Sequence, residues 1–322
     1  MSSLSIMVIS NPAAPYLRGL DKLPAGTEVV IGNTPEAFAS LGDRADVVLY
    51  CMNAGVKLEA LWHLAPNARW LHSMAAGLES TLFPALVESE IPMTNARGVF
   101  KESLGEFGIA SILYFAKDLR RMNRNQEAGR WEQFDVEMIT GKTLGIVGYG
   151  EIGRATAVRA KALGLNIHAI RRRPELSGSD PVVDRSFAIA DRTEMLAGSD
   201  YVLVAAPLTE ETRGLIGAAE LAAMKSSAVL INLGRGPVVD EAALVAALSS
   251  GQIRGAALDV FDVEPLPAGH PFWTLENVLL SPHCADHTAT WTDEAIQFFV
   301  DNCQRFVEGK PLENLVNKKA GY

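Results

Sequence analysis

The chain has few of the features that cross-link a protein or anchor it in a membrane. Its 322 residues include three cysteines, Cys51, Cys284 and Cys303, too scattered for a disulfide framework and without the paired spacing of a zinc site. No run of 18 or more apolar residues occurs, and the first residues lack a basic segment followed by a long apolar region. These absences predict a soluble protein of a reducing compartment, which we take to be the cytoplasm, with an organelle address left open.

The chain also lacks an excess of positive charge. Its formal net charge of −9 argues against general affinity for nucleic acids or anionic membranes. Hydrophobic residues make up 48% and charged residues 21% of the chain, as in ordinary globular proteins, and the length suffices for two domains. We find no Gly/Ser-rich linker, internal repeat or low-complexity tract, so hinge closure about fixed crossings is the expected motion.

Short apolar runs of strand length divide the chain into two parts. Before about residue 100 they predict a small open sheet, with strands at 6–9, 28–31, 47–50, 70–72 and 92–94. From about residue 141 strands and helix-like stretches alternate more regularly, with strands at 143–147, 166–170, 201–205, 228–231, 256–260 and 278–280. We predict an α/β protein with a doubly wound parallel Rossmann sheet and a second, smaller flavodoxin-like α/β domain. Long helices are expected at 102–121 and 292–307.

A glycine-rich motif follows the strand predicted at 143–147. It reads Gly148-Tyr149-Gly150-Glu151-Ile152-Gly153, and a helix-like stretch continues to Leu163 with Gly164 as its stop. In this context the first glycine permits a tight turn, the second lets the backbone approach a pyrophosphate, and the third lets helix and strand pack closely. The helix N-terminus faces the phosphate charge. The six motif residues are therefore predicted to bind a dinucleotide.

Three arginines end the next predicted strand, in the run Arg171-Arg172-Arg173-Pro174. An NAD-preferring site usually carries an acidic residue here for the ribose 2′-hydroxyl, and that acid is absent. A guanidinium in its place can pair with the extra phosphate of NADP. We therefore predict that the arginines bind NADP, with NAD less favoured. A solvated basic turn is the alternative interpretation.

Three polar residues, Arg235, Glu264 and His283, each come shortly after one of the last three predicted strands. Ligands of an open parallel sheet bind outside the carboxyl ends of its strands, so the three side chains are expected in one site. Arginine presents a planar fork that holds a carboxylate and polarises the neighbouring carbonyl, and histidine exchanges a proton near neutral pH. A carboxylate behind the imidazole fixes its tautomer. This set suits hydride transfer to a 2-oxo acid.

The chain resembles the D-isomer-specific 2-hydroxyacid dehydrogenases. The most specific segments are Asn232-Leu233-Gly234-Arg235-Gly236, Asp259-Val260-Phe261 with Glu264-Pro265, and Ser281-Pro282-His283. The resemblance implies that Arg235, Glu264 and His283 are catalytic and that Asp259 lies near the nicotinamide carboxamide. Further cofactor contacts are expected from Pro207, Thr212, Leu233 and Ala285.

The resemblance also implies a substrate site, a domain arrangement and an oligomeric state. The loop Ala75-Ala76-Gly77 is expected to bind the substrate carboxylate through backbone N–H groups, together with Arg235 and His283. Residues 1–100 and 291–322 are expected to form a discontinuous substrate-binding domain, and residues 101–290 the dinucleotide-binding domain. The family commonly dimerises through its cofactor domain, so we expect a homodimer. The segment 121–139 is its interface arm or a solvated excursion.

Several residues keep two interpretations. Arg97 is either a second substrate contact or a surface charge. Asp286 stands where the family commonly has small residues and either caps the last helix or alters substrate choice. Trp291 is either a core anchor or a wall of the substrate pocket. His287 follows His283 by four residues, but both lie in a predicted loop without a third ligand, so no metal site is expected.

Together these features predict an NADP(H)-dependent oxidoreductase that moves hydride between nicotinamide and a small 2-oxo acid or D-2-hydroxy acid, working mainly as a reductase. Glyoxylate, hydroxypyruvate and bulkier 2-oxo acids all fit. The alternative is a non-catalytic, nucleotide-sensing binding protein on the same scaffold. The complete set of Arg235, Glu264 and His283 favours the enzyme.

Overall fold

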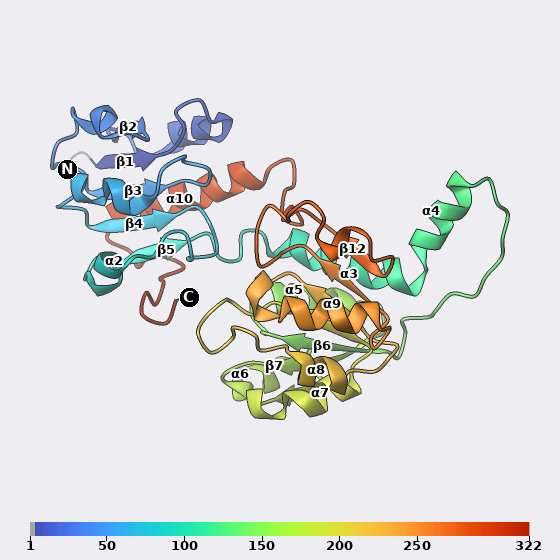
Figure 1. Cartoon of the computed structure of the whole chain (residues 1–322). Helices are drawn as coiled ribbons and strands as arrows, with labels where there is room; N and C mark the ends of the chain where they lie inside the picture. Colours follow the sequence, from blue (N-terminus) through green and yellow to red (C-terminus); the bar gives the residue numbers. More distant parts are fainter. Residues whose placement is uncertain (1–3, 322) are drawn as a thin grey trace. The chain divides into compact units, whose positions relative to one another are not determined.

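The chain divides into two compact units. The computed structural model describes residues 4–321, apart from the side chains at 177 and 178. One unit consists of Met1–Phe100 and Thr288–Tyr322, and the other of Lys101–His287. Figure 1 colours their elements along the sequence. The polypeptide therefore passes between the units twice, at residues 100–101 and 287–288.

The smaller unit contains a five-stranded parallel sheet of order β2-β1-β3-β4-β5, which is the flavodoxin-like order. Most residues of β1, β3 and β4 are buried, as expected for parallel strands that are covered on both faces. The strands are β1 (Ser5–Ile9), β2 (Glu28–Gly32), β3 (Val47–Tyr50), β4 (Trp70–Ser73) and β5 (Met93–Asn95). The helical segments are η1 (Pro15–Lys22), η2 (Pro35–Phe38), α1 (Leu58–Leu61), η3 (Trp62–Leu64), α2 (Pro84–Glu88) and α10 (Trp291–Val307).

His72 lies fully buried in the core of this unit. Its Nδ1 lies 2.7 Å from Thr94 Oγ1, which also accepts a hydrogen bond from Trp70 Nε1 at 2.8 Å, whereas His72 Nε2 has no hydrogen-bond partner among residues 4–321. The ring packs against Phe298 and Phe299. Burial lowers the pKa of His72 from its usual 6.5 to about 3, so the imidazole is neutral in the folded protein.

This burial predicts that stability falls in mild acid. The unfolded chain binds a proton at His72 below about pH 6.5 and the folded chain does not until about pH 3, so the free energy of unfolding decreases by about 1.4 kcal/mol per pH unit across this window. From pH 7 to pH 5 the loss at this site is about 2 kcal/mol. His72→Phe keeps an aromatic ring and removes the titration, so its urea unfolding should lose that much of the pH dependence. Identical pH dependence in the two proteins would contradict the assignment.

The larger unit contains a seven-stranded parallel sheet of order β12-β11-β10-β9-β6-β7-β8, the doubly wound Rossmann order with one added strand. Its strands are β6 (Thr143–Val147), β7 (Asn166–Ile170), β8 (Arg185–Phe187), β9 (Tyr201–Val204), β10 (Val229–Asn232), β11 (Gly255–Leu258) and β12 (Val278–Leu280). The predicted fold class is confirmed in both units. The short edge strand β8 was not predicted, because three residues carry no usable periodicity.

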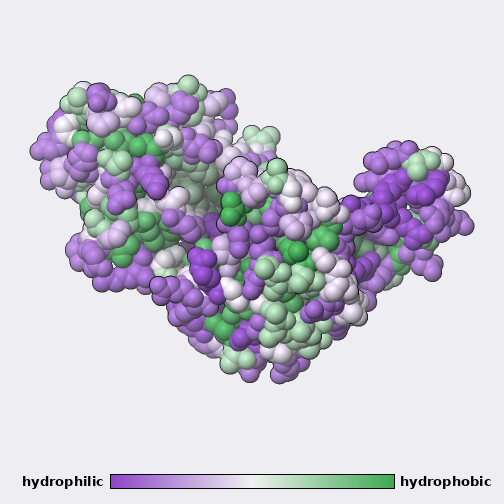
Figure 2. All heavy atoms as spheres, in the orientation of Figure 1, coloured by the Kyte–Doolittle hydropathy of each residue, from purple (hydrophilic) through white to green (hydrophobic). Residues whose placement is uncertain are grey.

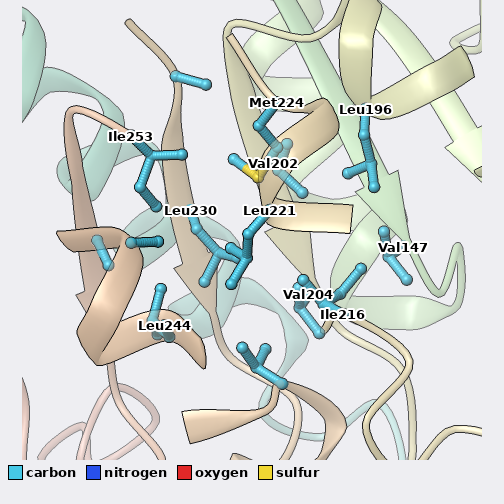
Figure 3. Close-up of a cluster of buried hydrophobic side chains, with 14 of the residues drawn as sticks. Val147, Leu196, Val202, Val204, Ile216, Leu221, Met224, Leu230, Leu244 and Ile253 are labelled. Carbon is cyan, nitrogen blue, oxygen red and sulfur yellow. The ribbon is translucent and has the colours of Figure 1, made fainter. Parts of the chain in front are cut away.

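Helices cover both faces of this sheet. On one face α7 (Arg192–Gly198), α8 (Ala218–Ala223) and α9 (Glu241–Ser249) pack on alternate strand residues, among them Val147, Val204 and Leu230 (Figure 3). On the other, α5 (Glu151–Ala162) packs on β6 and against α3 (Lys101–Ala116). The remaining helical segments are α6 (Pro174–Gly178), η4 (Ile189–Asp191), η5 (Gly236–Val238) and η6 (Pro271–Trp273). No helix in the described part of the chain is long and apolar enough to cross a membrane.

The prediction of a single helix at 102–121 is wrong. The chain instead forms α3 and a second helix, α4 (Leu119–Glu127), separated at Asp118, which adopts a left-handed backbone conformation with φ of 48°. The Asp118 side chain accepts a hydrogen bond from the backbone N–H of Arg121 at 3.3 Å. Asp118 therefore caps α4, and this capping competes with continuation of α3.

Candidate active site

The glycine-rich turn after β6 is built for close backbone approach. A side chain on Gly148, whose φ is +94°, would clash with the backbone of Ala206, and one on Gly153 would meet the Gly148 carbonyl oxygen at 2.9 Å. At Gly150, the N-terminus of α5, an added Cβ would have no protein atom within 4 Å. Packing thus requires two of the glycines, and the exposed backbone at the third fits a pyrophosphate on the helix N-terminus.

Tyr149 is an anchor of this turn, and its partner was not found from the sequence. The Tyr149 side chain is buried, and its hydroxyl donates to Asp180 Oδ2 at 3.1 Å. Arg154 Nε on α5 donates to the same oxygen at 2.7 Å. Burial and the neighbouring carboxylate raise the pKa of the Tyr149 hydroxyl. Asp180 therefore ties the segment after β7 to the glycine-rich turn, a contact between residues 31 positions apart that no local pattern indicates.

The three arginines after β7 differ in their surroundings. Arg171 is half-buried and Arg173 is exposed. Arg172 Nη2 lies 2.6 Å from Glu211 Oε2, in the loop that follows β9. The structure thus places the basic run at the carboxyl edge of the sheet, beside the glycine-rich turn, and its binding of a 2′-phosphate stays a prediction.

The other residues expected at the cofactor lie at the same edge of the sheet. Pro207 and Thr212 belong to one turn after β9, in which Thr212 Oγ1 donates to the Pro207 carbonyl oxygen at 2.6 Å. Leu233 is buried directly after β10. Ala285 follows β12, and its backbone groups bond to Asp259 and to Ser103.

Arg235 comes three residues after the end of β10, in extended conformation before η5. Its Nη1 donates to the Gly234 carbonyl oxygen at 2.7 Å. A side chain on Gly236 would overlap the backbone of Phe261 and Asp262, so only glycine lets the ends of β10 and β11 approach this closely. That approach brings the arginine segment against the segment that carries Glu264.

Glu264 and His283 form the pair that the sequence predicted. His283 Nδ1 lies 2.6 Å from Glu264 Oε2, and the other carboxylate oxygen accepts from the backbone N–H of Phe261 at 3.0 Å. The carboxylate is therefore fixed at both oxygens. An Nδ1–H donated to Glu264 leaves Nε2 as the ring atom that exchanges a proton with a substrate. The imidazole is about 43% exposed, so a small molecule can reach it.

Asp259 organises the loop that presents His283. Its Oδ1 accepts hydrogen bonds from Ser281 Oγ at 2.5 Å and from the backbone N–H groups of Cys284 and Ala285 at 2.9 and 3.1 Å. Burial raises the pKa of the Asp259 carboxyl, and these bonds oppose the rise. His283 itself adopts a left-handed conformation with φ of 52°, which is uncommon for a residue with a Cβ. The three bonds to Asp259 hold the loop in that conformation.

The expected substrate loop belongs to the smaller unit. Ala75, Ala76 and Gly77 follow β4, and Asn95 Nδ2 donates to the Ala76 carbonyl oxygen at 2.6 Å. Arg97, two residues beyond Asn95, is exposed. The structure therefore orders this loop through the end of β5, and its contact with substrate stays a prediction.

The structure bears on two of the residues that kept two interpretations, Asp286 and Trp291. Asp286 does not cap α10, which begins at Trp291 after Thr290 and has no side-chain cap bond. Asp286 Oδ1 is instead buried without a hydrogen-bond partner in the described residues, 3.7 Å from His287 Nε2. Trp291 packs edge-on against Phe100. Within residues 4–321, no group of three or more His, Cys, Asp or Glu side chains is arranged to hold a metal ion.

Comparison with known proteins identifies the family. Residues 109–285 match the model of the D-isomer specific 2-hydroxyacid dehydrogenase NAD binding domain. The chain belongs to the D-isomer specific 2-hydroxyacid dehydrogenase family, and the predicted resemblance is confirmed. The protein is therefore an oxidoreductase.

Individual relatives cover most of the chain. A glyoxylate/hydroxypyruvate reductase B of Yersinia pestis (strain Pestoides F) is 34% identical over 293 residues, 88% of this chain and 87% of the relative. A glyoxylate reductase of Aeropyrum pernix is 37% identical over 296 residues, 88% of this chain and 86% of the relative. The solved structure of a family member from Xanthobacter autotrophicus Py2, in complex with NADPH and MES, aligns over the full length of both chains with a TM-score of 0.86 and 31% identity.

Proposed function

We propose that the protein is an NADPH-dependent reductase of small 2-oxo acids, with glyoxylate and hydroxypyruvate as the first candidates. The observation that carries this proposal is the hydrogen-bonded pair of Glu264 and His283. Glu264 follows β11, His283 follows β12, and Arg235 follows the neighbouring strand β10. Two relatives are named for reduction of glyoxylate or of glyoxylate and hydroxypyruvate, and the Xanthobacter structure contains NADPH.

Each catalytic side chain then has one task. Bound NADPH supplies the hydride. The Arg235 guanidinium holds the substrate carboxylate and polarises the adjacent carbonyl, on whose oxygen negative charge develops. His283 Nε2 gives its proton to that oxygen and leaves a neutral ring, while Glu264, fixed by the backbone N–H of Phe261, accepts the Nδ1–H bond and keeps the ring oriented. Asp259 holds the His283 loop and, in the proposed complex, also lies near the nicotinamide.

The units also have proposed tasks. We assign the substrate-binding role to residues 1–100 with 291–322, through the Ala75-Ala76-Gly77 loop, and the dinucleotide-binding role to residues 101–290. Pro207, Thr212, Leu233 and Ala285 are proposed to line the cofactor.

Steady-state assays with NADPH and NADH against a panel of 2-oxo acids test the proposal. We expect turnover of glyoxylate or hydroxypyruvate, because a planar guanidinium and a proton donor suit any small 2-oxo acid. Binding of NADPH with no turnover of any member of the panel would instead support the nucleotide-sensing alternative.

A charge reversal at Arg171 is expected to weaken the NADPH preference. One charge-assisted bond to the 2′-phosphate stabilises the complex by roughly 1.5–3 kcal/mol, so the parent should favour NADPH over NADH by about 10- to 150-fold in kcat/KM. Arg171→Asp should lower this ratio mainly by raising KM for NADPH. Arg185→Asp, an equal charge change at an exposed residue of β8, is the control. Equal kcat/KM for both cofactors in the parent protein would contradict this role and support the alternative that the arginines form a solvated basic turn.

We also propose a homodimer formed through α4 and the extended segment after it. In this arm Trp131 is 96% exposed and Met138 70% exposed, which is unusual for such large apolar side chains. The arm is anchored to its own unit by ion pairs that include Arg124 with Glu276 and Arg254 with Glu137. The face of α4 seen in Figure 2 is mainly hydrophilic. Light scattering that gives the mass of a single 34.7 kDa chain would contradict a dimer.

A further inference from the structure

An exposed ion pair joins two loops on either side of the glycine-rich turn. Arg172 follows β7, Glu211 lies in the loop after β9, and their Nη2 and Oε2 atoms are 2.6 Å apart. Strand β6, which leads into the turn, lies between β7 and β9 in the sheet. Residues 39 positions apart in sequence thus meet across the end of β6.

This place is the switch point of the sheet. From β6 the chain runs outward through β7 and β8, then returns to β9 on the other side of β6. Dinucleotides bind in the crevice at such a point, outside the carboxyl ends of the strands. The Arg172 side chain is 50% exposed and the Glu211 side chain 67%, so both are accessible to a ligand that enters this crevice.

We propose that Glu211 tunes cofactor choice by competing with the 2′-phosphate of NADPH for Arg172. The inference rests on the proposed use of the arginine run for NADPH. A phosphate that approaches Arg172 meets a carboxylate already bonded to the same guanidinium, and the two anions repel each other. The 2′-hydroxyl of NADH carries no charge, so the ion pair with Glu211 can persist when NADH binds. Glu211 therefore weakens NADPH binding selectively.

Equilibrium titration of NADPH and NADH, followed by cofactor fluorescence without substrate, tests the competition. Glu211→Gln removes the negative charge and nearly keeps the side-chain shape. Because an exposed ion pair holds its partners weakly, we expect NADPH to bind about two- to five-fold more tightly, with NADH unchanged within error. Raising the salt concentration should reduce the difference.

Glu210→Gln is the matched control, since Glu210 is the exposed neighbour of Glu211 and the described part of the chain shows no ion pair for it. It makes the same charge change in the same loop and should leave both affinities unchanged. Equal tightening of NADPH by both variants would show a general field effect and overturn the proposal. Weaker NADPH binding in Glu211→Gln would overturn it too, because Glu211 would then hold Arg172 in place for the phosphate.

A double-mutant cycle with Arg172→Ala is the second test of the proposal. If competition for Arg172 is the cause, Glu211→Gln has no effect on NADPH binding once Arg172 is absent. Tightening that persists without Arg172 overturns the assignment. A parent protein that reduces no 2-oxo acid refutes the proposed function, whereas unchanged NADPH affinity in Glu211→Gln refutes this inference alone.

Discussion

Replacement of His283 by alanine is expected to lower kcat for 2-oxo acid reduction by at least about 100-fold, while NADPH still binds. The expected size is the low end for general acid catalysis, because the variant has no group to protonate the developing alkoxide. The Nδ1 bond to Glu264 Oε2 at 2.6 Å orients the ring for this task. Steady-state kinetics gives the loss of rate, and fluorescence titration gives the affinity for NADPH.

Two further variants separate proton donation from a general disturbance of the loop. His287→Ala removes an imidazole four residues along the chain and should change kcat by less than about three-fold, since the proposed mechanism gives His287 no task. Glu264→Gln keeps a hydrogen-bond acceptor beside Nδ1 without the negative charge, so we expect a loss between those of the two histidine variants. Near-normal turnover in His283→Ala would remove this residue from the mechanism.

Replacement of Arg235 by lysine is expected to lower kcat/KM by about 10- to 150-fold, although the positive charge is kept. Lysine offers a point charge on a flexible stem in place of a planar fork, so the variant loses at least one charge-assisted bond of roughly 1.5–3 kcal/mol. Arg235 lies between Gly234 and Gly236, in a segment where a larger neighbour would strike the backbone of Phe261. The backbone on both sides of Arg235 is therefore closely packed.

The control for this substitution is Arg185→Lys, on the edge strand β8, which should leave kcat/KM unchanged. Measurement with glyoxylate and hydroxypyruvate shows whether the loss is common to both substrates, as a contact to their shared 2-oxo carboxylate requires. A lysine variant with the kcat/KM of the parent would show that a general positive field suffices, and the bidentate hold on the carboxylate would be wrong.

The sequence by itself determined the two sheets and the dinucleotide turn. Strands such as β6 and β10 are covered on both faces, so they appear as unbroken apolar runs that predict their place. Gly153 is required by its contacts with Ile146 and Gly148 in the same strand–turn–helix unit, and Gly148 has a positive φ, so a local motif can record both glycines. The placement of Arg235, Glu264 and His283 after three neighbouring strands could be predicted because the carboxyl ends of parallel strands share one edge.

Only the tertiary structure decided which side chains meet at that edge. The hub at Asp259, the anchor of Tyr149 on Asp180 and the pair of Arg172 with Glu211 each join residues 22 to 39 positions apart. Loops bring these partners together, and loop geometry depends on packing against the whole sheet rather than on local periodicity. The break at Asp118, by contrast, involves a local contact, because its capping bond joins residues three positions apart. Local propensity favours one continuous helix there, and a single capping bond in the folded chain ends it.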